Sequence, residues 1–301
     1  EGTGAASEWC FWNTHLGPEL FVAVDFCWYY KYSLDEKRLR DKIYPFLKGV
    51  IHLYMGIACE GTDGYLHIPF TTSPEFTDSH GRMMEEDATF TLSTLHYLLE
   101  NMKEYAGICG EDGAQLSAWL RRLAPVCTTE WVLPLFPGVD IYKSHRHFSH
   151  LFPLFPLGEE AHNELASLSL DAVINQGFSE YAAFSFPCLA IMAARCGRGN
   201  MARTMLEIYC MAFRSANSFT VNGDPYNNGI LRISDTNAGE SADAFTLESG
   251  FIVPAALCEM FVHRSKDRIW FLPGIPEEWK TCSCRGLAVE GGHIISGARE
   301  N

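Results

Sequence analysis

Apolar residues recur at steps of three and four along most of this chain, the spacing that places them on one face of an α-helix. Between residues 34 and 60 this spacing is kept by Leu39, Ile43, Phe46, Leu47, Val50, Ile51 and Tyr54. Pro45 falls inside that stretch and is expected to bend the helix, because proline cannot donate a backbone hydrogen bond. The pattern predicts helices over 18–33, 34–60, 85–107, 111–125, 158–174, 179–196, 200–214 and about 247–262.

The segments between these helices differ greatly in length. A polar stretch bearing Pro and Gly fills 61–82, another long loop fills 126–157, and a third, rich in Asn, Gly and Asp, fills 215–244. The tight turn "GRGN" joins two helices at 197–200. Such a chain fits a toroid of antiparallel helix pairs, with short turns on one side and a site built by the long loops on the other. A repeat solenoid is the alternative, but no fixed sequence period supports it.

The pattern changes after residue 264. "DRIWFLPGIPEEWK" and "CRGLAVEGGHIISGA" are short runs of apolar and β-branched residues separated by Gly and Pro, which is typical of strands. The expected fold is therefore mainly α, with helices over 1–264 and strands over 265–301.

Composition narrows the class of protein. The chain has 301 residues, 47% of them hydrophobic, which is enough for a sizeable core. Its 23 basic and 37 acidic residues give a formal net charge of −14, and an acidic protein repels a phosphate backbone. We therefore expect no nucleic-acid partner. No stretch is long and apolar enough to predict a membrane span, and no signal peptide opens the chain, which looks trimmed.

The eleven cysteines are odd in number and irregular in spacing, and the only tight pair is "CSC" at 282–284. Several lie within apolar helical patterns, where cysteine behaves as a small buried hydrophobe. We expect mostly free thiols, which favours a reducing setting.

Four stretches, in this order, resemble glycoside hydrolase family 95. They are "YKYSLDEKRLRDKIYPFLKGVIHLYM", "TTSPEF", "HRHFSHLFPLFP" and "DRIWFLPGIPEEWKTCSCRGLAVEGG". This is the α-L-fucosidase family, which also contains α-L-galactosidases; its members carry a "TSPE" loop, an "HRHLSHL" loop and a closing "LLPALPxxW" segment.

The resemblance implies an (α/α)6 barrel preceded by other domains and followed by a β-sandwich. Residues 1–264 would hold most of the barrel without its N-terminal part, and 265–301 the first strands of the sandwich. The family's "NxN" motif, whose asparagines help to position water, has no counterpart here. The resemblance also implies a periplasmic or secreted protein, whereas the cysteines favour a reducing setting, so the location stays open.

Glycoside cleavage with inversion needs an acid on the leaving oxygen and a base for water, about 6.5–9.5 Å apart. Glu75 matches the family's "TSPE" glutamate and is the candidate acid. A solvent-exposed loop carboxylate is the simpler alternative. We expect no cofactor and no metal.

Glu248 is the candidate base. It occupies the position of the aspartate in the family's "FQIDGNFG", where this chain has "FTLESGF". The carboxylate is one methylene longer than the family's, and a misplacement of about 1 Å can cost on the order of 10²-fold in rate. The simpler alternative is an acidic residue at a helix start, which the helix dipole favours.

The stretch "HRHFSHLFPLFP" at 145–156, called here the histidine-rich loop, has three possible explanations. By resemblance, His145, Arg146, His147 and His150 line or brace a sugar pocket, where imidazole and guanidinium groups suit hydroxyls. Three histidines at this spacing could instead bind zinc, but no further ligand lies alongside them. They could also be part of a buried loop with no ligand.

Three functions remain open from the sequence. The leading hypothesis is an inverting exo-α-L-fucosidase-like enzyme acting on terminal sugars of oligosaccharides or glycans. A catalytically weak or inactive carbohydrate-binding barrel is the second, and a related α-L-galactosidase or phosphorylase is the third.

Overall fold

The computed structural model describes residues 16–76, 85–223 and 245–300, and its fold is mainly helical, as predicted. The chain divides into two compact units, each described here by itself. Unit 1 comprises residues up to 129 together with 133–140 and 290–292, and unit 2 comprises 130–132, 141–289 and the chain from 293 onward.

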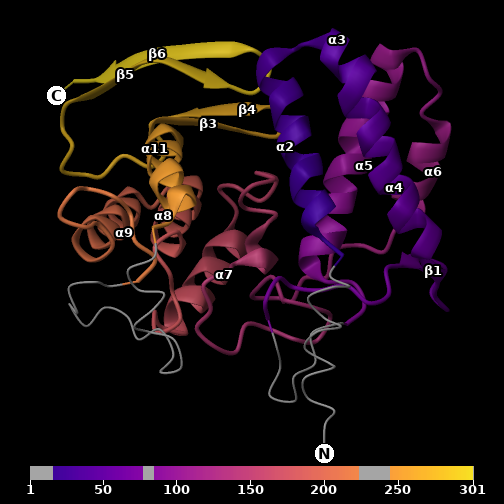
Figure 1. Ribbon diagram of the computed structural model, residues 1–301, viewed down its shortest axis with the longest axis horizontal. Helices are drawn as coiled ribbons and strands as arrows, with labels where there is room; N and C mark the ends of the chain where they lie inside the picture. The colour runs from indigo at the N-terminus through magenta and orange to yellow at the C-terminus, as the bar shows by residue number, and fades with distance from the viewer. Residues whose placement is uncertain (1–15, 77–84, 224–244, 301) are drawn as a thin grey trace, which may run out of the picture. The chain divides into compact units, whose positions relative to one another are not determined.

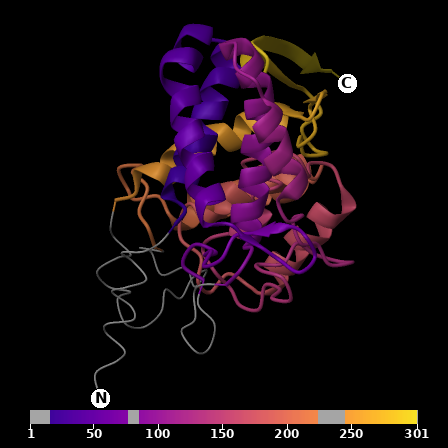
Figure 2. The ribbon, with the colours of Figure 1, turned by 90° about the vertical axis from the view of Figure 1, so that its right-hand side faces the viewer.

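Unit 1 is built on helices that lie side by side (Figures 1 and 2). They are α2 (Pro18–Ser33), α3 (Glu36–Arg38), α4 (Tyr44–Ile57), α5 (Thr89–Cys109) and α6 (Ala114–Arg122). Helix α5 is buried along most of its length and packs against α2, α4 and α6, so it forms the core of the unit. The short hairpin of β1 (Cys59–Glu60) and β2 (Leu66–His67) follows α4.

The predicted helix over 34–60 is divided by a π-helical segment, Leu39–Ile43, directly before Pro45. In this segment the N–H of Tyr44 donates to the carbonyl of Leu39, five residues back. Pro45 has no N–H to donate, and its ring crowds the carbonyl four residues earlier. The wider turn accommodates the proline, so the helix continues instead of ending.

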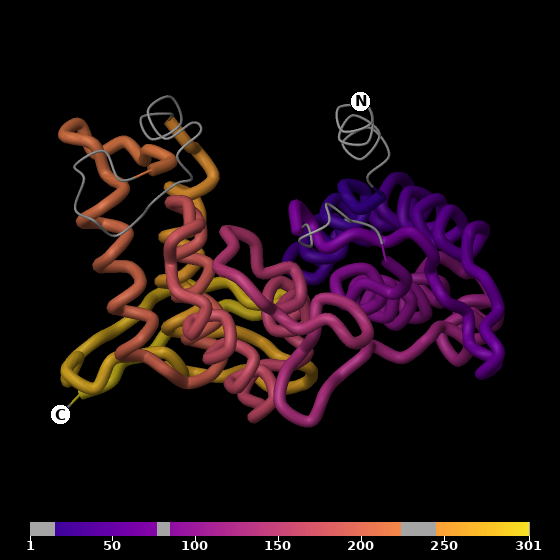
Figure 3. The backbone as a smooth tube through the Cα atoms, turned by 90° about the horizontal axis from the view of Figure 1, so that it is seen from below, coloured from indigo at the N-terminus to yellow at the C-terminus, as the bar shows by residue number. Residues whose placement is uncertain are grey.

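Unit 2 combines helices with two β-hairpins. Its helices are α7 (Glu164–Asn175), α8 (Ser185–Arg195), α9 (Gly199–Ala212) and α11 (Leu247–Phe261). Its strands are β3 (Val262–Ser265), β4 (Arg268–Phe271), β5 (Cys282–Val289) and β6 (His293–Arg299), paired antiparallel as β3–β4 and β5–β6 (Figure 3). Every residue of α8 is buried except Cys188, and α8 packs against both α9 and α11. That residues 265–301 belong to a separate β-sandwich domain stays a prediction.

The segment "LPGIP" packs very closely against the helices of unit 2, and glycines make this possible. A Cβ atom on Gly274 would lie 2.6 Å from the Cβ of Ala194 in α8. A Cβ on Gly199, at the start of α9, would lie 2.4 Å from the carbonyl oxygen of Ile275. Larger residues at either position would push this segment away from the helices.

A buried polar network joins α8, α11 and β3. Arg195 donates two hydrogen bonds to Glu259, at 2.8 and 2.9 Å, and a third to the carbonyl of Leu154 at 2.9 Å. His263 lies against Glu259, and its Nε2 is 3.0 Å from Nε2 of His162. The ring of His162 stacks on Trp270 with centroids 3.6 Å apart.

The Arg195→Met variant is expected to lower the free energy of unfolding by about 3 kcal/mol, because the Glu259 side chain, which is only 13% exposed, would lose its cation. Urea unfolding followed by tryptophan fluorescence measures the change. The control is Arg122→Met, which removes an exposed pair with Glu60 and should cost less than about 1 kcal/mol. Equal losses in the two variants would contradict this account of the network.

Stability is expected to fall as the pH is lowered from about 7 to about 4.5. Burial lowers the pKa of His162 to about 4 and also lowers the pKa of His263. Unfolded histidine has a pKa of about 6.5, so in this window these two residues bind more protons in the unfolded chain than in the folded chain, and their contribution to stability falls. Chemical denaturation at several pH values measures the slope, which should be shallower in His162→Phe; an unchanged slope in that variant would sink the idea.

Candidate active site

Residues 71–76, the described part of the loop that carries Glu75, are largely buried. Thr71, Thr72 and Ser73 are each at most 1% exposed, and the N–H of Phe76 donates to the carbonyl of Ser73 at 2.9 Å to close a turn. Glu75 lies within this turn at φ 59°, a backbone conformation that non-glycine residues adopt rarely. Such strained positions occur preferentially at functional sites.

One threonine ties this loop to the segment that begins α5. The backbones of Thr71 and Glu85 exchange hydrogen bonds of 2.8 and 3.0 Å. The Thr71 hydroxyl donates to the carbonyl of Glu85 and accepts from the N–H of Ala88, both at 2.7 Å. One side chain thus satisfies two backbone groups and fixes the loop at both ends.

Asp87 provides a second hydrogen-bonded connection between this loop and the segment before α5, which the sequence did not predict. Its Oδ1 accepts from the N–H of Ile68 at 2.8 Å, and its Oδ2 is hydrogen-bonded to Nδ1 of His67. His67 and Asp87 are twenty residues apart and show no local spacing signal. Only the closure of the loop brings them together.

The carboxylate of Glu75 is partly enclosed. The residue is half-buried, and its Oε2 atom is shielded from solvent. This arrangement, on a loop tied at both ends, suits a group that must donate a proton to a bound substrate.

In unit 2, the histidine-rich loop is held by serine hydroxyls. Ser144 donates to the carbonyl of Gly177 at 2.8 Å and accepts from the N–H of Glu180 at 3.1 Å. Ser185, the first residue of α8, donates to the carbonyl of Arg146 at 3.0 Å. These bonds fix both the start and the middle of the loop.

The four predicted binding residues lie within six consecutive positions of this loop. Nδ1 of His145 accepts from the N–H of His147 at 3.1 Å, and the ring of His147 stacks on Phe184 with centroids 5.2 Å apart. His145 is buried, His147 is half-buried and Arg146 is exposed. The backbone therefore turns these neighbouring side chains toward different environments.

His150 has an unusual environment. It is 1% exposed, and neither ring nitrogen has a hydrogen-bond partner within 16–76, 85–223 and 245–300. Burial, with a smaller contribution from His145, lowers the pKa of His150 to about 3, so the ring is neutral near pH 7. A buried, neutral imidazole has one donor and one acceptor to offer.

Glu248 lies in the first turn of α11 and is exposed. Its side chain forms no ion pair within the described part of the chain. The helix start is held by the N–H of Thr246, which donates to the carbonyl of Thr220 at 3.1 Å. Glu75 belongs to unit 1 and the other five predicted site residues belong to unit 2, so their joint action stays a prediction.

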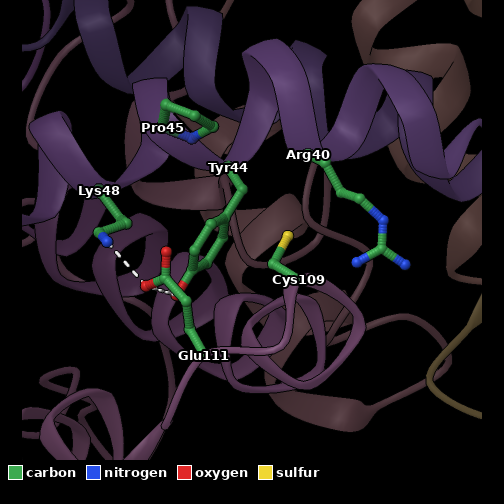
Figure 4. Close-up of a pocket in the computed structure, with 6 residues that line it drawn as sticks. All are labelled: Arg40, Tyr44, Pro45, Lys48, Cys109 and Glu111. Carbon is green, nitrogen blue, oxygen red and sulfur yellow. Dashed lines mark hydrogen bonds and ion pairs between the residues drawn. The ribbon is translucent and has the colours of Figure 1, made fainter.

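A surface pocket of about 310 Å³ on unit 1 contains none of these residues (Figure 4). It is lined by Arg40, Tyr44, Pro45, Lys48, Cys109 and Glu111. Lys48 pairs with Glu111 at 2.7 Å, and Arg40 pairs with Glu36 at 2.7 Å. Because its cations already have partners, the pocket offers no clear site for an anion.

The cysteines and the membrane-span prediction can be compared with the described residues. Ten cysteines among the described residues are free. None of the helices that these residues form combines the length and apolar character needed to cross a membrane.

Comparison with known proteins agrees with the motifs. Residues 2–261 match the model of the glycosyl hydrolase family 95 catalytic domain. The chain is 25% identical over 286 residues to "Alpha-L-fucosidase 2" of Arabidopsis thaliana, covering 89% of this chain and 32% of that protein. The chain therefore spans about a third of this relative's length.

A solved structure shares the fold. "Putative kojibiose phosphorylase from human microbiome" superposes with a TM-score of 0.64 and 13% identity, covering 94% of this chain and 42% of that one. The predicted class, helices of the (α/α)6 type followed by strands, is confirmed. With the family model matching most of its length, the chain belongs to glycoside hydrolase family 95.

Proposed function

We propose that this chain is part of the catalytic domain of an inverting exo-glycosidase of the α-L-fucosidase type, acting on terminal sugars of oligosaccharides or glycans. The observation that carries the proposal is Glu75, which matches the family's "TSPE" glutamate and lies on a loop tied at both ends. The relative named as an α-L-fucosidase supports the sugar class.

The reaction follows from the roles of two carboxyl groups. Glu75 donates its proton to the glycosidic oxygen as the bond to the anomeric carbon breaks. Glu248 takes a proton from water, whose oxygen attacks the opposite face of the anomeric carbon. The products are a free sugar of inverted configuration and an alcohol, and proton exchange with solvent then restores both groups.

The histidine-rich loop would bind the sugar. Buried imidazoles and an exposed guanidinium can donate and accept hydrogen bonds with hydroxyl groups in different directions. His150 is the strongest candidate for direct contact, because its burial is costly unless a polar partner is supplied.

A catalytically weak carbohydrate-binding barrel is the second candidate. One observation favours it: Glu248 is exposed and one methylene longer than the family's aspartate. Binding of a fucoside without turnover by the wild-type protein would support this function.

Glu75→Gln is expected to reduce hydrolysis of aryl α-L-fucosides by about 10²–10⁴-fold while sugar binding persists, because glutamine cannot donate the proton. Proton NMR of the released sugar measures the rate and the anomeric configuration, with α-L-galactosides and added phosphate as further arms. Glu100→Gln is a matched control, since Glu100 is exposed on α5 and pairs with Lys103 at 3.0 Å. Full activity of Glu75→Gln would exclude it as the acid, and release of a sugar phosphate would identify a phosphorylase.

His150→Leu is expected to weaken sugar binding by about tenfold or more while changing the free energy of unfolding by less than about 1 kcal/mol. The imidazole makes no hydrogen bond to the described residues, so replacing it removes little folding energy and relieves a buried polar group. Calorimetric sugar titration and urea unfolding measure the two effects. A large loss of stability with unchanged sugar affinity would show that His150 is a structural residue.

A further inference from the structure

Three carboxylates surround the imidazole of His67. On one side, its Nδ1 is hydrogen-bonded to Oδ2 of Asp87 and lies 3.8 Å from Oε1 of Glu86. On the other side, its Nε2 lies 3.1 and 3.2 Å from the two carboxylate oxygens of Asp63. Both ring nitrogens therefore face acidic side chains.

The negative charge of this cluster is not balanced by the described residues. No lysine or arginine among them pairs with Asp63, Glu86 or Asp87. The cluster therefore carries a net charge of about −2 even when His67 is protonated. The side chain of Asp87 is only 5% exposed, and a buried carboxylate is costly unless a cation accompanies it.

The distances suit a metal ion. The ligand atoms of His67, Glu86 and Asp87 all lie within 4.8 Å of one another. Nitrogen and oxygen ligands of a first-row divalent metal lie about 2.0–2.2 Å from the ion, so two ligand atoms can be up to about 4.4 Å apart. A small movement of the exposed Glu86 side chain would close the set.

Asp63 is not one of the three candidate ligands, but its carboxylate orients the imidazole of His67. A histidine that binds a metal almost always directs its other ring nitrogen to a carboxylate or carbonyl, which fixes the ring orientation. Metal binding would release the Nδ1 proton that is hydrogen-bonded to Asp87. With Nε2–H still donating to Asp63, the lone pair of Nδ1 would then face Glu86 and Asp87. This is the tautomer that metal binding requires.

The backbone holds these groups in place. A Cβ atom on Gly61 would lie 2.7 Å from the His67 ring and from Asp63, so only glycine leaves room for both. Oδ1 of Asp63 also accepts from the N–H of Tyr65 at 3.1 Å. Asp87, at φ 60°, uses Oδ1 for the N–H of Ile68 and leaves Oδ2 for the site.

We propose that His67, Glu86 and Asp87 bind a divalent transition-metal ion such as Mn²⁺ or Zn²⁺, with Asp63 orienting the imidazole. A mixed set of one imidazole and two carboxylates suits these ions better than Ca²⁺, which prefers oxygen ligands alone. The ion would join β2 to the segment before α5 and so brace the intervening loop. It takes no part in the proposed hydrolysis, for which we expect no metal.

The test uses Mn²⁺ as the probe. After treatment with EDTA and its removal, the protein is expected to bind one Mn²⁺ per chain, with nitrogen modulation from His67 in pulsed electron paramagnetic resonance. At Mn²⁺ about 100-fold above its dissociation constant, the unfolding temperature should rise by about 5 °C. Zn²⁺ should displace the bound Mn²⁺.

Variants assign the ligands. His67→Gln should remove the nitrogen modulation, and Glu86→Gln should weaken Mn²⁺ binding by about tenfold or more while leaving the fold intact, because Glu86 is exposed. If His67→Gln does not fold, Glu86→Gln decides the question. Glu100→Gln, on the exposed face of α5, should bind as the wild type does.

Absence of Mn²⁺ and Zn²⁺ binding by the wild-type protein would overturn the proposal and leave a protonated His67 between carboxylates. Binding that Glu86→Gln leaves unchanged would overturn the assignment of ligands. Neither outcome depends on glycosidase activity, so this proposal and the proposed function fail separately.

Discussion

The predicted site residues depend on irregular loops, and an irregular loop can be buried only if its backbone N–H and C=O groups find partners. Both units meet this constraint with hydroxyl side chains that donate to one backbone carbonyl and accept from one backbone N–H. Thr71 does so beside Glu75, and Ser144 does so at the start of the histidine-rich loop. Ser185 acts in the same way, donating to Arg146 and accepting from the N–H of Ala182 at 3.1 Å. Small hydroxyl residues thus position the larger chemical groups.

Hydrophobic spacing predicted the helices well where packing alone determines them. The helix predicted over 18–33 has those bounds, and α9 and α11 differ from their predicted ranges by at most two residues. The helices predicted from 158 and 179 begin later, at Glu164 and Ser185. In the first case Asn163 caps the helix, accepting from the N–H of Ala166 at 3.0 Å. In the second, the residues before Ser185 serve as partners of Ser144, which spacing does not reveal.

Only those parts of the candidate site that lie in short contiguous motifs could be predicted from the sequence. "TSPE" and "HRH" led to Glu75 and to the histidine-rich loop because each motif is contiguous. The buried state of His150 was not predictable, since it depends on how the loop folds back on itself. The group around His67 was missed because its members come from two separated parts of the chain, and no metal was expected from the sequence.

A tilt of helix α11 would move Glu248 much further than Glu259, because Glu259 is held by Arg195. Glu259, near its last turn, is fixed by Arg195, whereas Glu248 lies eleven residues earlier in its first turn. At 1.5 Å per residue this is a lever arm of about 16 Å, so a tilt of about 4° would displace the Glu248 carboxylate by about 1 Å. Pro254 lies between the two ends and removes one hydrogen bond from the helix. The reach of the candidate base therefore depends on the bond from Thr246 to Thr220, which holds the start of α11, as well as on the length of its own side chain.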